Sequence, residues 1–285
     1  MLTVLLRAAE GVQVTLTPDQ MRASAQDLFL SAKRFYAWSL IVKGAGFLAG
    51  AVTAFTGTSW WIPVVLLALT TASDVFQMAS DTRKGKAEDF TRRVEFWDGF
   101  GWPPSDRELR QLPLTRTRPD ALYFASDQQS GPVRAMENLE EQAWWSRELY
   151  GRMAALLLGA FFLMVIAAVV VLLLVSLSGQ GSNGQPGVKL VIAGLNVVLS
   201  FGLWRLHASY QKAAQAASQV EQAADSLKRK YASDPNFPEV EAVRLYHSYQ
   251  LARASAPLIP DTIYHFFRAE LNRRWDHRAE PTRTT

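Results

Sequence analysis

The stretch Met153–Val175 constrains the fold of this 285-residue chain more than any other feature. Its 23 residues include no charged and no hydrogen-bonding side chain. As a helix the stretch would be about 35 Å long, enough to cross a hydrocarbon core of about 30 Å. Because the core helix of a soluble protein is rarely so long and so uniformly apolar, we predict a transmembrane helix here.

Further apolar segments predict four spans in two helical hairpins. The first hairpin is expected over residues 36–80, with its turn at Thr56–Ser59 and Pro63 in the first turn of its second helix. The second hairpin is expected over residues 152–207, with a helix at about Val188–Leu206 after a glycine-rich, uncharged loop. The predicted fold class is therefore all-α, an integral membrane protein with four transmembrane helices and a helical cytoplasmic domain.

Basic residues gather at one end of the predicted spans. They precede the first and third spans and follow the second and fourth: Lys33, Arg34, Arg83, Lys84, Lys86, Arg92, Arg93, Arg147, Arg152, Arg205 and Lys212. Tryptophans flank both ends, as an aromatic belt would. Since cytoplasmic loops carry the excess of Lys and Arg, we expect both termini and the long middle segment in the cytoplasm.

The cytoplasmic parts are predicted over residues 1–35, 81–151 and 208–285. Thr17 is expected to cap a helix that starts at Pro18 and runs into the first span, after a short hairpin over Leu2–Leu16. The acidic pair Glu140 and Glu141 is interpreted as surface charge. Further helices are expected over Gly131–Tyr150, Ala208–Tyr231, Glu239–Ala254 and Pro260–Trp275.

Motifs of catalysis are missing from the sequence. The chain has no cysteine, which excludes disulfides and thiolate metal sites, and its four histidines make no helical metal pair. Gly44–Ala49 fits a loose dinucleotide-binding pattern, but it lies inside a predicted membrane helix, where small residues allow close packing. We therefore expect no enzyme, no cofactor and no metal.

Polar and small residues inside the spans form stripes. On the first helix they recur at intervals of four and three, which places them on one face. A water-filled pore and a dry polar interface both explain such stripes, and we predict that Lys43 and Asp74 pair at similar depth, because a charge in a span is costly. The candidate pore-lining residues are Ser39, Lys43, Gly46, Gly50, Asp74, Asn196 and Ser200.

Short motifs beside the spans resemble a known family. They are Gln20–Tyr36, Leu122–Ser126 with Asn138–Tyr150, and Gln250–Arg253 with Pro257–Tyr264 and Arg268–Asn272. In layout and in these stretches the chain resembles the bacterial four-transmembrane effector family associated with SMODS nucleotidyltransferase and SLOG defence systems. The resemblance implies abortive anti-phage immunity, in which such effectors open pores or disrupt the inner membrane when a nucleotide second messenger changes.

That function implies several partners. Four helices can hardly enclose a wide conduit, so we expect a homo-oligomer in the lipid bilayer. The resemblance implies a cyclic or linear oligonucleotide signal and a partner nucleotidyltransferase encoded nearby. Phosphates require guanidinium groups and a base stacks on an aromatic ring, so Arg253, Tyr264 and Arg268 are the candidate ligand-binding residues. Alternatively, these three residues tie the domain together or contact lipid headgroups.

Other functions remain open at this point. A small transporter would predict discontinuous helices or repeated halves, and the two hairpins are not obviously similar. A membrane-bound enzyme acting on lipid or nucleotide lacks a catalytic constellation. A non-catalytic membrane scaffold is compatible with the sequence.

Overall fold

The computed structural model describes residues 17–56, 61–105, 126–177, 202–231 and 237–283. Within these ranges the chain forms helices and no strand, which confirms the all-α prediction. The helices are α2 (Pro18–Thr56), α3 (Ile62–Phe100), α5 (Pro132–Leu177), α7 (Leu203–Lys230), α8 (Glu239–Ser255) and α9 (Asp261–Arg283).

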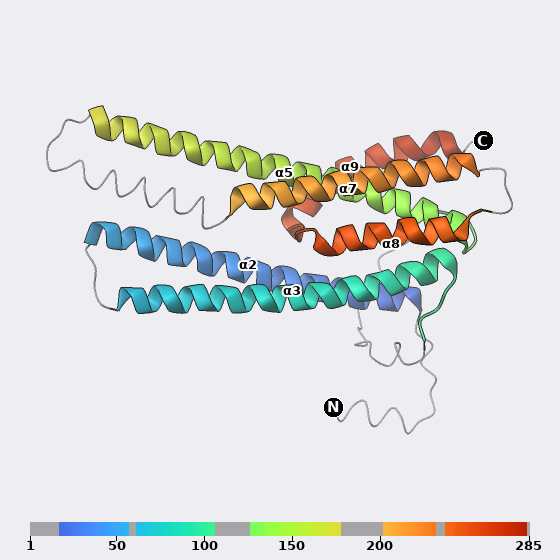
Figure 1. Ribbon diagram of the computed structural model, residues 1–285, viewed down its shortest axis with the longest axis horizontal. Helices are drawn as coiled ribbons and strands as arrows, with labels where there is room; N and C mark the ends of the chain where they lie inside the picture. The colour runs from blue at the N-terminus through green and yellow to red at the C-terminus, as the bar shows by residue number, and fades with distance from the viewer. Residues whose placement is uncertain (1–16, 57–60, 106–125, 178–201, 232–236, 284–285) are drawn as a thin grey trace, which may run out of the picture.

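Two long antiparallel helix pairs form the frame of the molecule. The pair α2–α3 lies beside the pair α5–α7, and Thr56 and Leu177 end their helices at the same end of the molecule (Figure 1). Contacts within each pair are more extensive than contacts between the pairs. At the opposite end, α8 lies between the pairs and α9 runs along α5 and α7 (Figure 1).

The start of α2 is as predicted. The backbone N–H of Gln20 donates to Thr17 Oγ1 over 3.3 Å, and the N–H of Thr17 donates to Gln20 Oε1 over 3.1 Å. This reciprocal capping satisfies two N–H groups that a helix N-terminus otherwise leaves unpaired. With Pro18 as its first residue, α2 continues unbroken into the first predicted span.

Helix α3 is longer than the sequence suggested. Pro63 lies in its first turn, as predicted, but the helix continues past Ser80 to Phe100. Ion pairs of Asp89 with Arg92 and Arg93, three and four residues apart, support this extension. It ends at Gly101, whose φ of 78° is in the left-handed region that glycine adopts without strain.

Two of the described helices are long and apolar enough to cross a membrane: α3 and the part of α5 over residues 132–170. Only 6% of the most apolar part of α3 and 11% of that of α5 is buried inside the chain, whereas the core helix of a soluble protein would be mostly buried. These two helices indicate membrane association. The first predicted span is less apolar, because it contains Lys43 and three glycines. Most of the predicted fourth span, and the hairpin over Leu2–Leu16, lie outside the described residues.

The main core lies where α8 fills the space between the two pairs. It joins Phe100 of α3 to Leu139 of α5, Val220 of α7 and Tyr246 of α8. The predicted helices over residues 131–150, 208–231, 239–254 and 260–275 are all observed, the last one extended to Arg283.

One prediction about this region was wrong. Glu140 is buried, not part of a charged surface, and pairs with Lys228 of α7 and Arg278 of α9. A buried carboxylate needs such partners, and both come from distant parts of the sequence.

Candidate functional site

Acidic residues occur at every seventh position along α3: Asp74, Asp81, Glu88 and Glu95. Seven residues are almost two helical turns, so each step rises about 10.5 Å and rotates by only about 20°. The four carboxylates therefore follow one face of α3, from its apolar half into the core region. We call these four residues the acidic column.

The far half of the acidic column faces α8. The Arg253 guanidinium lies 3.1 Å from Glu88 Oε2 and 2.9 Å from Glu95 Oε1, and the Gln250 amide also donates to Glu95. Glu95 is only 2% exposed, and this burial raises the pKa of its carboxyl while Arg253 opposes the rise. Because α8 lies between the two helix pairs, these contacts show that Glu88 and Glu95 point toward the space between the pairs.

In the near half of the column, Asp74 lies in the predicted membrane span and Asp81 directly follows the end of that span. Asp74 and Asp81 are exposed, and no ion pair or hydrogen bond reaches the Asp74 carboxylate from the described residues. The Gln77 amide donates to Asp81 over 3.1 Å, and the exposed Thr70 hydroxyl donates to the Leu66 carbonyl. The helix thus presents a polar stripe that begins in an otherwise apolar segment and ends just after it, made of Thr70, Asp74, Gln77 and Asp81.

The neighbouring face of α3, which contacts α2, is closely packed. The hydroxyls of Ser39 and Ser73 lie 3.1 Å apart and both side chains are buried. A Cβ added at Gly46 would lie 3.7 Å from Leu69. Ser39 and Gly46, predicted to line a pore, therefore lie at the interface of two helices.

The predicted pair of Lys43 and Asp74 is not formed among the described residues. Ser73, and not Asp74, faces α2, and Asp74 lies one residue further round α3, where it is exposed. Lys43 and Gly50 are half-buried on α2. Asn196 and Ser200, the candidates of the fourth span, lie outside the described residues.

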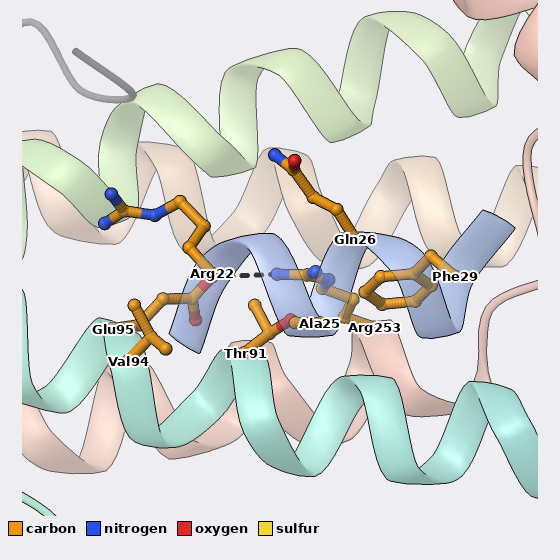
Figure 2. Close-up of a pocket in the computed structure, with 8 residues that line it drawn as sticks. All are labelled: Arg22, Ala25, Gln26, Phe29, Thr91, Val94, Glu95 and Arg253. Carbon is orange, nitrogen blue, oxygen red and sulfur yellow. Dashed lines mark hydrogen bonds and ion pairs between the residues drawn. The ribbon is translucent and has the colours of Figure 1, made fainter. Parts of the chain in front are cut away.

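A cavity of about 100 Å³ adjoins the buried end of the acidic column. Figure 2 shows Arg253 extending from α8 toward Glu95, with the ring of Phe29 beside it. The cavity is lined by Arg22, Ala25, Gln26 and Phe29 of α2, Thr91, Val94 and Glu95 of α3, and Arg253 of α8. This volume has room for several water molecules.

The three candidate ligand-binding residues fall into two places. Arg253 contacts α2 and α3: its guanidinium is engaged by Glu88 and Glu95 and lies 5.8 Å from the Phe29 ring centre. This arrangement fits the alternative that Arg253 ties the domain together. On α9, the exposed Arg268 lies with its guanidinium 5.9 Å from the ring centre of Tyr264, so these two residues share a face as predicted.

Two features of the site were missed from the sequence. The acidic column was visible as a period of seven in residues 74–95. Lys84 was interpreted only as one of the basic residues that set the membrane topology, but its ammonium donates to the backbone carbonyls of Ala254 and Ala256, 170 and 172 residues away. No local pattern signals such a contact.

No family model, curated protein or solved structure matches the chain. The resemblance to the four-transmembrane effector family therefore stays a prediction.

Proposed function

We propose that this chain is a pore-forming effector of the bacterial inner membrane, and that its oligomer conducts cations. The observation that carries the proposal is the acidic column. It follows one face of α3 from the apolar half into the helical domain, where Glu88 and Glu95 point toward the space between the two helix pairs.

The cost of burying a charge in lipid supports a wet environment for this face. An ionised carboxylate at the centre of a bilayer is expensive, so an intramembrane Asp74 indicates water or an ion beside it. The other side of α3 is suited to lipid, because Val64 and Val75 are exposed there. A conduit lined by carboxylates concentrates cations and repels anions.

Further copies of the chain complete the conduit in this proposal. In the single chain Asp74 and Asp81 remain exposed, and the two helix pairs make few contacts away from α8. A homo-oligomer would surround these side chains with protein.

The signal is proposed from the resemblance together with α9. Tyr264 and Arg268 offer an exposed guanidinium beside an aromatic ring, which is the chemistry that recognises a phosphate and a stacked base. Arg253 is less suited, because two carboxylates already neutralise it. We propose a cyclic or linear oligonucleotide as the ligand and anti-phage immunity as the role.

Single-channel recording in planar bilayers tests the proposal. With a potassium chloride gradient, the full-length protein should give currents whose reversal potential is closer to the equilibrium potential of potassium than to that of chloride. Asp74→Asn should lower the unit conductance and move the reversal potential toward zero, whereas Val75→Leu, its lipid-facing neighbour, should change neither. Channels that prefer chloride, or an Asp74→Asn channel identical to wild type, would refute the proposed lining.

The signal is tested in the same bilayers. Candidate oligonucleotides added on the side of α9 should raise the open probability of the wild-type channel, and Arg268→Ala should abolish that response. The exposed Arg273→Ala is a matched control with the same loss of charge on the same helix. A normal response in Arg268→Ala would place the binding site elsewhere.

A further inference from the structure

The connection between α8 and α9 touches both helix pairs. We define the α8–α9 connection as residues 256–260, from Ala256 after α8 to Pro260 before α9. It lies near the residues at which the predicted spans leave the membrane. Together with Ala254 and Asp261, which flank it, the connection contacts α2, α3, α5 and α7, so it lies at the point where these four helices converge.

Polar contacts hold the connection and the residues that flank it to three of the helices. The Lys84 ammonium of α3 donates to the carbonyls of Ala254, over 2.7 Å, and Ala256. The Tyr210 hydroxyl of α7 donates to the Leu258 carbonyl over 2.6 Å. Lys33 of α2 pairs with Asp261, the first residue after the connection.

Apolar contacts hold it to the fourth helix. Ala256 is buried in one cluster with Tyr150, Met153 and Ala154 of α5, and Ile259 packs against the same cluster. Met153 is the first residue of the long apolar stretch of α5. The connection therefore lies at the cytoplasmic end of the predicted spans.

The connection crosses the acidic column. Lys84 lies on α3 between Asp81 and Glu88, so the carbonyls that it binds lie between the two halves of the column. Asp74 and Asp81 are on the membrane side, where they are exposed, and Glu88 and Glu95 are on the other side, where Arg253 occupies them. An ion that followed the column would meet the connection halfway.

The chemistry of the connection suits a segment that is held in place but can be released. Pro257 and Pro260 have no N–H and fix their φ angles, so the segment keeps its shape. The carbonyls at the end of α8 have few partners in their own chain segment, and a cation is favourable there. Burial lowers the pKa of the Lys84 ammonium, so its charge depends on these carbonyls and on nearby carboxylates.

We propose that the α8–α9 connection is the cytoplasmic gate of the conduit, closed in this structure and opened when it leaves Lys84 and Tyr210. This inference rests on the proposed function. It also links the signal to the conduit, because Tyr264 and Arg268 lie on the first two turns of α9, directly after the connection. A ligand that displaces this part of α9 would therefore also displace the gate.

Substitutions at the contacts of the gate test the proposal in planar bilayers. Lys84→Met removes both carbonyl contacts and keeps the length of the side chain, and it should raise the open probability of the unliganded channel about tenfold or more. Tyr210→Phe removes only the hydroxyl and should act in the same direction. Lys86→Met is the matched control: it loses the same charge two residues away at an exposed position and should behave as wild type. Unit conductance and reversal potential should stay unchanged in all of them.

A reversible lock tests the same idea in the opposite direction. The chain has no cysteine, so Lys33→Cys with Asp261→Cys introduces the only two thiols, at the position of an ion pair. In a Lys84→Met background, a reducible crosslink between them should return the open probability to the wild-type level, and reduction should restore the high value.

The outcomes separate the gate from the conduit. Cation channels whose open probability is the same in wild type and Lys84→Met would overturn the gate and leave the proposed function intact. A lock that leaves the channel open would do the same. If wild type and all variants are folded in the bilayer and none of them conducts, the proposed function fails and the gate fails with it.

Discussion

The guanidinium of Arg253 lies 2.9 Å from Glu95 and 3.1 Å from Glu88, and so ties α8 to α3 where both carboxylates are shielded from solvent. Arg253→Ala would leave Glu95 buried without its cation. Breaking a buried ion pair costs about 3–5 kcal/mol, and because Gln250 still donates to Glu95 we expect about 2–4 kcal/mol of lost stability. Thermal unfolding of the detergent-solubilised protein measures this loss. An unchanged melting temperature would contradict the assignment of Arg253 as a structural tie.

The same residue pair predicts a pH dependence. Burial raises the pKa of Glu95 above its ordinary value of 4.5, so the folded chain binds this proton more tightly than the unfolded chain. The contribution of Glu95 to stability is therefore greatest below pH 4.5 and is lost as the pH rises through the raised pKa. The difference in stability between wild type and Glu95→Gln should change in favour of Glu95→Gln over this window. A difference that is constant with pH would show that Glu95 has the same pKa in both states.

Close packing between α3 and α5 gives a prediction with a control on the same helix. A Cβ added at Gly99 would lie 3.1 Å from both Cα and Cβ of Ala135, so the two helices would have to separate. Gly99→Ala should cost about 1–3 kcal/mol. Gly85→Ala meets no atom within 4 Å and should instead stabilise α3, by up to about 1 kcal/mol, because alanine favours helix. Both are measured by unfolding in detergent, and equal effects of the two substitutions would contradict this packing.

Local signals in the sequence located most of the helices. Thr17 and Pro18 marked the start of α2, and the absence of any charge over Met153–Val175 marked the apolar half of α5. The extension of α3 beyond Ser80 was missed, because this part of the sequence is rich in charged residues and shows no helical period of apolar residues. Ion pairs along the helix surface support it instead. Local pattern is sufficient where capping and hydrophobicity decide the structure.

Contacts between distant segments could not be predicted in this way. Glu140 is buried because Lys228 and Arg278 reach it from other helices. The angular position of Asp74 on α3 depends on which face of α3 packs against α2, and that face carries Ser73 and Ser80. Contacts between distant segments also place the candidate ligand-binding residues in two different parts of the molecule. Arg253 pairs with Glu95 of α3, whereas Tyr264 packs near Trp145 of α5.

Membrane topology remains a prediction from the basic residues, and reporter fusions measure it. A reporter fused after Gln111 or at the C-terminus should be cytoplasmic, and one placed in residues 181–187 should be periplasmic. The wild-type distribution of Lys and Arg should be necessary for this orientation. A periplasmic C-terminus would overturn the arrangement of four spans.

The polar stripe of α3 makes the last prediction, on the environment of each face of the helix. The chain has no cysteine, so single substitutions report their own positions without background. In membranes, Asp74→Cys and Gln77→Cys should react with a charged, water-soluble thiol reagent, because this face lines water in the proposed conduit. Val64→Cys and Val75→Cys, exposed on the other side of α3, should be protected by lipid, where thiolate formation and access of a charged reagent are both disfavoured. The reaction rates are compared by mass spectrometry after a timed quench. Equal rates on both faces would mean that α3 is either wholly in lipid or wholly in water, and neither arrangement allows a conduit along the acidic column.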